Sequence, residues 1–212
     1  MIFKDRRDAG RKLLVKLFQK LKKTKQKIVV LSLLRGGTEV GDIIAKGLSA
    51  KHLPLVVAKI SSPDNPELAI GALCFDTVYL EKKVIDMLAI DKSDIRSQIQ
   101  KAKEKFNSYL KRFGIKQNVL SRWMKNKIAI IVDDGVATGS TIKVAILFVK
   151  SKNPKSIILA IPVAPEDFSI PGIDKEFILH KANDFKAVSQ FYKRFPQVED
   201  DDVKRMMKEK NS

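Results

Sequence analysis

The chain is poor in the residues that build disulfides and transition-metal sites. Its 212 residues include one cysteine, Cys74, and two histidines, His52 and His180. A single thiol excludes an intrachain disulfide framework and is typical of a reducing compartment. The histidines stand apart from one another and from any spacing of cysteines or carboxylates that would hold zinc. We therefore expect all three side chains to be structural, with Cys74 buried as a small apolar residue.

Long apolar runs are also missing. No stretch of the sequence approaches the roughly 20 consecutive apolar residues of a membrane-spanning helix. The N-terminal segment is charged from Lys4 onward and lacks the apolar core of a signal peptide. The sequence thus predicts a soluble, cytoplasmic protein without a membrane partner.

Acidic residues are outnumbered. There are 41 lysines and arginines against 24 aspartates and glutamates, a formal net charge of +17 at pH 7. Such an excess suits nucleic acid or a polyanionic substrate, and it also occurs as a solvated surface that attracts anions. The lysines are spread over the whole chain without the interleaved aromatic residues of a single-strand platform. The surface interpretation is favoured, and nucleic acid stays open as a partner.

Strand-like and helix-like patterns alternate along most of the chain. Short apolar runs occupy residues 28–34, 55–60, 128–132, 156–163 and 176–180. Apolar residues at helical spacing mark residues 8–22, 38–49 and 142–149. This alternation predicts an α/β fold, a doubly wound and mainly parallel sheet with helices on both faces. We expect residues 1–212 to form a single domain.

The alternation is interrupted between residues 61 and 127. A turn-rich break with two prolines at residues 61–66 precedes strand-like pieces at 68–73 and 77–80. These pieces predict a hairpin at the edge of the sheet, and residues 91–113 predict a long amphipathic helix. The region therefore has the pattern of an insertion. The charged tail, residues 199–212, is expected to be helical or frayed.

Residues 128–141 carry the strongest functional signal. The apolar run 128–132 delivers two carboxylates, Asp133 and Asp134, at the carboxyl end of a predicted buried strand. Small and hydroxylated residues then lead into a helix: Ala137, Thr138, Gly139, Ser140 and Thr141. Free N–H groups at a helix N-terminus bind phosphate, and carboxylates accept hydrogen bonds from a vicinal diol. The turn lacks the Gly-Lys-Ser/Thr ending of a P-loop and the three glycines of a dinucleotide fingerprint. The segment predicts a site for a ribose 5-phosphate.

This segment resembles the phosphoribosyl diphosphate (PRPP) loop of type I phosphoribosyltransferases. Residues 5–11, 65–72 and 190–198 also resemble a group of bacterial proteins called predicted phosphoribosyltransferases, so the similarity covers nearly the whole chain. The resemblance implies the type I fold with an inserted hairpin and helix at about residues 61–127. It also implies a small hood at about residues 164–198, with contributions from the N-terminus. Leu34 and Ser189 depart from the pattern, standing where Pro and Gly are usual.

The resemblance implies a reaction and a role for each candidate residue. The ribose 5-phosphate group of PRPP would pass to a nitrogen nucleophile, a base or an amine, with release of pyrophosphate. Residues 137–141 would bind the 5-phosphate, and Asp133 and Asp134 the ribose hydroxyls. Arg35 and the backbone of Gly36 and Gly37 would bind the pyrophosphate. The catalytic candidates are thus Asp133, Asp134, Arg35 and Lys59, although a solvated lysine at the end of a strand is nearly as good an interpretation of Lys59. Mg²⁺ would be carried by the substrate and water, with no dedicated protein ligands.

The acceptor is not defined by the sequence. Phe185 looks like the hood aromatic that stacks on a base, and a core phenylalanine is an equal alternative. Ala137 stands where hypoxanthine-type enzymes have an aspartate, which argues against the hypoxanthine/guanine reaction without establishing adenine. Two other functions stay open: a non-catalytic PRPP- or nucleotide-sensing regulator that binds nucleic acid, and hydrolysis or pyrophosphorolysis in the same pocket. Members of this family often dimerise, so a homodimer is also open.

Overall fold

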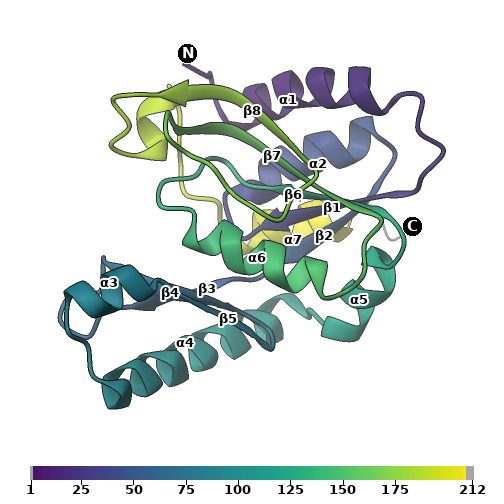
Figure 1. The fold of residues 1–212 in the computed structure, drawn as a ribbon. Helices are drawn as coiled ribbons and strands as arrows, with labels where there is room; N and C mark the ends of the chain where they lie inside the picture. Colours follow the sequence, from purple (N-terminus) through teal and green to yellow (C-terminus); the bar gives the residue numbers. More distant parts are fainter. Residues whose placement is uncertain (1, 209–212) are drawn as a thin grey trace.

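The computed structural model describes residues 2–208 of the chain. Its centre is a five-stranded parallel sheet with the strand order β2-β1-β6-β7-β8 (Figure 1). Every neighbouring pair of strands in this sheet is parallel. The strands are β1 (Ile28–Leu33), β2 (Lys51–Leu55), β6 (Ile128–Val132), β7 (Ser156–Pro165) and β8 (Lys175–Ala182).

Helices cover both faces of the large sheet. Helices α1 (Arg6–Leu21) and α2 (Gly37–Gly47) pack on one face, and α5 (Gln117–Met124) and α6 (Ser140–Lys150) on the other. Strand β6 is buried along its whole length because it is apolar on both sides: Ile130 contacts the first pair of helices, and Ile131 the second. The predicted doubly wound fold class is confirmed.

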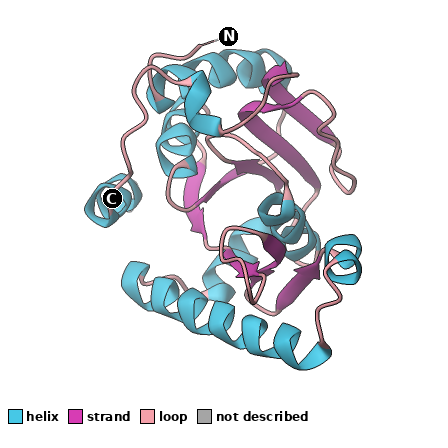
Figure 2. Ribbon diagram, turned by 90° about the vertical axis from the view of Figure 1, so that its left-hand side faces the viewer, coloured by secondary structure: helices cyan, strands magenta, loops and turns pink. Residues whose placement is uncertain are grey.

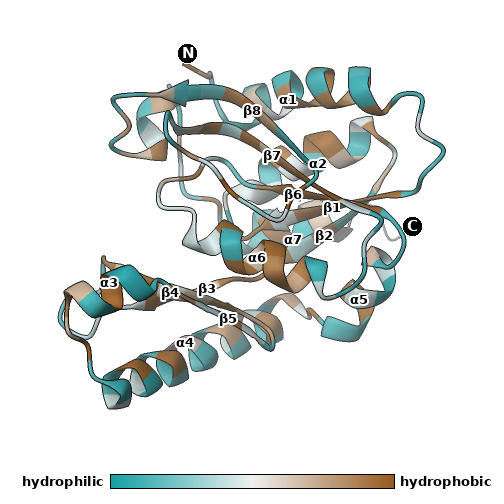
Figure 3. Cartoon of the chain, viewed as in Figure 1, coloured by the Kyte–Doolittle hydropathy of each residue, from teal (hydrophilic) through white to brown (hydrophobic). Residues whose placement is uncertain are grey.

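A second, smaller sheet lies between α6 and a long helix (Figures 1 and 2). Its three antiparallel strands are β3 (Ala58–Ser61), β4 (Ala69–Cys74) and β5 (Thr77–Leu80). The long helix α4 (Lys92–Phe113) buries Ala102 and Phe106 against it, and Figure 3 shows both hydrophilic and hydrophobic colours along that helix. Cys74, at the end of β4, is fully buried, as predicted.

The small sheet corrects two expectations. The predicted single strand at residues 55–60 is wrong, because Leu55 ends β2 in the large sheet and Ala58 begins β3 in the small one. The chain passes from the large sheet to the small one at Val56 and Val57. Residues 55–58 are all apolar, so the sequence pattern does not indicate a break between two strands there. The predicted hairpin exists as β4 and β5, but it pairs with β3 and not with the edge of the large sheet.

Four further elements were not predicted or only partly predicted. Helix α3 (Lys82–Met87), α5 and the 3-10 helix η1 (Val188–Phe191) were missed, since each is too short for a periodic pattern. The predicted tail is helical as α7 (Asp200–Lys208), and its residues 209–212 lie outside the described residues. Within residues 2–208, no helix combines the length and the apolar character needed to cross a membrane.

Candidate active site

Two loops meet at the carboxyl ends of β1 and β6. These strands are neighbours, with Ser32 paired to Val132, so the chain leaves both of them at the same edge of the sheet. The loop after β1 contains a cis peptide bond between Leu34 and Arg35 and then turns at Gly36 into α2. The loop after β6 begins with Asp133 and Asp134. The structure therefore brings the two predicted loops together.

The two loops are so close that side chains would not fit between them. A Cβ atom on Gly37 would lie 2.8 Å from the Val132 carbonyl oxygen and 2.9 Å from the Asp133 Cα. A Cβ atom on Gly36 would overlap the Asp134 carboxylate. Glycine at both positions therefore allows the Arg35 loop to approach the two carboxylates.

Asp134 is bound by two residues from the ends of the chain. The Arg6 Nε donates a 2.7 Å hydrogen bond to Asp134 Oδ2, and the Tyr192 hydroxyl donates to the Asp134 carbonyl oxygen at 2.6 Å. Arg6 is fixed in turn, since its Nη1 donates to the Pro196 carbonyl oxygen at 2.6 Å and its guanidinium lies 3.7 Å from the Phe195 ring centre. The sequence analysis assigned no role to Arg6 or Tyr192, because nothing in their local pattern indicates a partner more than 50 residues away.

Burial governs the protonation of the two carboxylates. Desolvation raises the pKa of Asp133 well above the usual range, and the neighbouring Asp134 charge raises it further. Desolvation also raises the pKa of Asp134, against the opposing charge of Arg6. A hydrogen bond from the Asp134 N–H to Asp133 Oδ1, 2.9 Å long, favours the charged form of Asp133 but does not reverse the direction. The pair therefore favours ligands that supply positive charge or hydrogen-bond donors.

The turn between β6 and α6 has the geometry of an anion site. Gly139 has a left-handed backbone with φ of 79°, and α6 begins at the next residue. Within residues 2–208, the N–H groups of Ala137, Thr138 and Gly139 donate to no protein acceptor. Ala137 and Thr138 are exposed. These donors and the positive end of the α6 dipole point to the binding of a phosphate.

A glutamate that directly follows the small sheet contacts the start of α6. The Ser140 hydroxyl donates to Glu81 Oε1 at 3.1 Å, and Lys143 Nζ donates to the same oxygen at 2.7 Å. The Tyr79 hydroxyl donates to Glu81 Oε2 at 2.9 Å. Glu81 thus anchors the β5–α3 junction to the start of α6. The sequence gave no indication of this contact, which joins residues about 60 positions apart.

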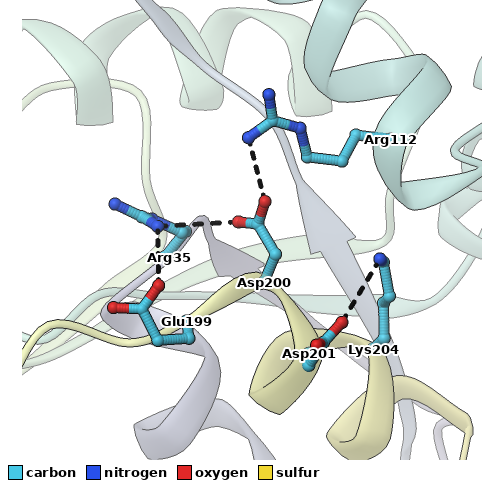
Figure 4. A network of polar contacts seen from close by, with 6 residues as sticks. All are labelled: Arg35, Arg112, Glu199, Asp200, Asp201 and Lys204. Atoms are coloured by element: carbon cyan, nitrogen blue, oxygen red, sulfur yellow. Dashed lines mark hydrogen bonds and ion pairs between the residues drawn. The ribbon is translucent and has the colours of Figure 1, made fainter.

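Arg35 is held by the acidic start of α7 (Figure 4). Its Nη1 lies 3.5 Å from Asp200 Oδ1 and 3.9 Å from Glu199 Oε2. Asp200 also pairs with Arg112 of α4, whose Nη1 lies 2.9 Å from Asp200 Oδ2. The Arg35 side chain is 27% exposed, so it is partly accessible to a ligand while it is paired.

Two predicted site residues contact other parts of the structure. Lys59 lies on β3, and its Nζ donates to the Glu67 carbonyl oxygen at 3.2 Å. Phe185 is half-buried and stacks on Phe191, with 5.3 Å between ring centres. The hood segment does approach the site, because a Cβ atom on Gly135 would lie 2.6 Å from the Val188 side chain. Among the described residues, no group of three histidine, cysteine or acidic side chains is arranged to hold a metal ion.

Comparisons with known proteins extend over nearly the whole chain. A family model described as a phosphoribosyl transferase domain matches residues 3–171. A Mycobacterium tuberculosis protein provisionally named a phosphoribosyl transferase is 36% identical over 95% of this chain. That match covers 45% of the relative, so the chain spans about half the length of the curated relatives it matches.

Solved structures agree with the fold. A Thermus thermophilus protein superimposes with a TM-score of 0.71 and 28% identity, and the match covers 99% of both chains. A hypoxanthine-guanine phosphoribosyltransferase from Bacillus anthracis has a TM-score of 0.50 at 9% identity, covering 93% of this chain and 94% of that one. At such low identity the second likeness concerns the fold alone.

Proposed function

Because the chain belongs to the phosphoribosyl transferase family, as its sequence predicted, we propose that it transfers the ribose 5-phosphate group of PRPP to a nitrogen nucleophile and releases pyrophosphate. One observation carries the proposal. The Asp133–Asp134 pair lies against the Gly36–Gly37 turn and is followed, two residues later, by the turn whose N–H groups lead into α6. Sites for a diol, a pyrophosphate and a monophosphate therefore adjoin one another, and PRPP carries all three groups.

Each predicted residue has a task in this proposal. The N–H groups of residues 137–141 and the hydroxyls of Thr138 and Thr141 bind the 5-phosphate, and the Ser140 hydroxyl joins them by leaving Glu81. Asp133 and Asp134 accept hydrogen bonds from the ribose hydroxyls and favour the positive charge that develops at the anomeric carbon. Arg35 and the backbone of Gly36 and Gly37 bind the leaving pyrophosphate. Lys59 is also assigned to the pyrophosphate, which requires its ammonium to leave the Glu67 carbonyl.

Magnesium belongs to this proposal as a substrate-borne ion. Mg²⁺ would neutralise the pyrophosphate, and it usually keeps several water ligands and few protein ones. Asp133 and Asp134 are the carboxylates we assign to attract it, because desolvation raises the pKa of each and added positive charge stabilises their charged forms.

The acceptor is proposed only as a chemical class, a nitrogen nucleophile. Phe185 lies at the hood with one ring face stacked on Phe191, and its half-exposed position supports a stacking contact with a planar base. The small side chain of Ala137 supplies no general base. A nucleophile that needs no deprotonation by this residue, such as an amine or a base with a free lone pair, therefore fits best.

Calorimetry of PRPP binding tests the proposal. PRPP titrated with Mg²⁺ should bind in the micromolar range. The variant Asp133→Asn with Asp134→Asn should bind at least about 100-fold more weakly, because hydrogen bonds to charged groups contribute about 1.5–3 kcal/mol each. The variant Asp64→Asn with Asp86→Asn, two exposed aspartates, is the matched control and should bind like the wild type. Equal affinity in both variants would refute the site.

A second assay separates the enzyme from the regulator. Pyrophosphate release is measured with PRPP and a panel of purines, pyrimidines and amines. Release that requires one acceptor supports the transferase, and release with water alone supports hydrolysis. Micromolar PRPP binding without release across the panel would instead favour the non-catalytic sensor.

A further inference from the structure

A second concentration of positive charge lies outside the candidate active site. A cavity of about 300 Å³ lies between the loop at the end of the edge strand β3 and the middle of α4. The loop forms a fixed wall, because the Ser61 hydroxyl donates to the Pro66 carbonyl at 2.9 Å and the Ser62 N–H donates to the Leu68 carbonyl at 2.9 Å. The polar lining residues are Lys59, Ser61, Ser62, Gln98, Lys101 and Lys105.

Regular secondary structure explains why these side chains converge. Gln98, Lys101 and Lys105 are three and four residues apart, so they form one stripe along α4. The adjacent stripe contains Ala102 and Phe106, which are buried against the small sheet and fix the helix there. The polar stripe of α4 therefore lies beside the buried stripe and lines the cavity on the side opposite the end of β3.

The lining carries positive charge and no negative charge. Within residues 2–208, Lys101 and Lys105 form no ion pair, and no carboxylate lines the cavity. The nearest acidic residues in the sequence point to other partners or to solvent: Glu104 accepts a hydrogen bond from Gln100, and Asp64 and Glu67 are exposed. Lys59 uses one of its three donors on the Glu67 carbonyl.

Such a lining suits a multivalent anion. Three lysines line one cavity, and a ligand with several negative charges can interact with all three. Lysine binds phosphate as a flexible point charge, and the Ser62 hydroxyl and the Gln98 amide add neutral donors. The volume is at the lower end of small-ligand pockets, roughly 300–1,000 Å³. It therefore suits a phosphate chain with the remainder of the ligand in solvent.

We propose that this cavity binds the diphosphate or triphosphate group of a small molecule. The cavity lies apart from the PRPP loops, since Arg35 and residues 133–141 contribute nothing to its lining, and Lys59 is the residue that the two proposals share. The proposal does not rest on the transferase activity. Free pyrophosphate and nucleoside triphosphates both carry such a phosphate chain. Their relative affinities show which of them the cavity binds. A bound anion would also hold the loop after β3, because Ser62, Pro63 and Pro66 of that loop line the cavity.

Calorimetry with inorganic tripolyphosphate tests the site. The titration uses the variant Lys101→Gln with Lys105→Gln, which leaves the residues assigned to PRPP unchanged and keeps good helix formers on an exposed face. This variant should bind tripolyphosphate at the cavity at least about tenfold more weakly, while its affinity for PRPP stays within about twofold of the wild type. Parallel titrations with pyrophosphate and ATP identify the source of the phosphate chain.

A matched variant removes the same charge elsewhere on α4. Lys103 and Lys111 are exposed and do not line the cavity, so Lys103→Gln with Lys111→Gln should bind tripolyphosphate like the wild type. Equal weakening in both variants would mean general attraction by the basic surface and would overturn the proposal. Unchanged tripolyphosphate binding in the variant Lys101→Gln with Lys105→Gln would also overturn the proposal. So would a result in which this variant keeps tripolyphosphate binding and loses the binding of a single-stranded oligonucleotide.

The PRPP site and the tripolyphosphate site can be tested independently. The variant Asp133→Asn with Asp134→Asn should lose PRPP binding and keep the tripolyphosphate binding that depends on Lys101 and Lys105. Loss of that binding in the aspartate variant would assign the anion to the PRPP loops and would also overturn the proposal.

Discussion

The Arg6 guanidinium and the Asp134 carboxylate form a 2.7 Å ion pair between residues 128 positions apart. Their side chains are only 6% and 14% exposed. The N-terminal segment therefore completes the site that the Asp133–Asp134 loop begins, and the pair is buried enough to matter for both stability and binding. Arg6 does not need to touch substrate for this: it positions Asp134.

Removing the Arg6 charge should destabilise the fold. Arg6→Gln leaves the Asp134 carboxylate buried without its cation, which typically costs about 3–5 kcal/mol. Urea unfolding at pH 8 should show a loss near the lower end of that range, because the pair is not fully enclosed. Arg7→Gln removes the same charge from an exposed neighbour and should change the free energy of unfolding by less than about 0.5 kcal/mol. Equal losses in the two variants would contradict a specific role for the pair.

The acidic start of α7 should compete with pyrophosphate for Arg35. Glu199→Gln with Asp200→Asn removes two partly exposed ion-pair partners, each worth about 0–1 kcal/mol. The affinity for PRPP, measured by calorimetry, should rise about two- to fivefold as Arg35 becomes available.

The same helix provides the control for that experiment. Asp201 and Asp202 pair with Lys204 and Arg205 inside α7, so Asp201→Asn with Asp202→Asn changes the net charge equally without touching Arg35. This variant should bind PRPP like the wild type. A weaker affinity after the Glu199 and Asp200 changes would mean that α7 supports Arg35 in its binding geometry and does not compete.

Gly36 should be required for binding and not for backbone conformation. Its φ of −58° suits any residue, but the Cβ atom of Gly36→Ala would overlap the Asp134 carboxylate. Displacement of that carboxylate should weaken PRPP binding at least about fivefold, given the roughly 1–3 kcal/mol cost of overpacking. Gly114→Ala is the contrasting variant, since its Cβ meets nothing within 4 Å and its φ of 63° costs stability alone. Unchanged PRPP affinity in Gly36→Ala would show that the two loops separate easily.

Because the pKa of Asp133 is raised, replacing its carboxylate by a neutral amide should increase the stability of the fold by an amount that depends on pH. The folded chain keeps this proton at pH values where the unfolded chain loses it. The stability that Asp133 contributes is therefore present below the ordinary aspartate pKa of about 3.9 and is lost as pH rises through the raised value. Asp133→Asn should raise the Tm more at pH 8 than at pH 4, and each ~1 kcal/mol corresponds to roughly 2–4 °C in a domain of this size.

Differential scanning calorimetry at both pH values measures that difference directly. Asp64→Asn, at an exposed position, serves as the reference for substitution effects unrelated to burial. A Tm that falls at pH 8 in Asp133→Asn would contradict the assignment and would mean that the carboxylate is satisfied by donors in the folded state.

Local patterns in the sequence determined the frame of this protein. Strand β6, the carboxylates at its end and the small-residue turn before α6 are contiguous, so the apolar period and the residue types specify them without tertiary context. The same holds for α1 and the long helix α4, whose amphipathic faces repeat over many turns. The convergence of the β1 and β6 loops is a consequence of the parallel fold class that the sequence predicted, because all strands of a parallel sheet end at one edge.

Tertiary structure decided which distant groups act on those loops. The partners Arg6, Glu81 and Asp200 come from segments far from the loop residues they contact, and a long-range ion pair leaves no local periodicity to read. The sequence also did not indicate that the chain passes from one sheet to the other at Val56 and Val57. Residues 55–60 are almost all apolar, so they fit a strand of either sheet. Hydrophobic pattern and turn chemistry therefore placed the candidate site, whereas packing of the two chain ends and the small sheet determined its charge balance.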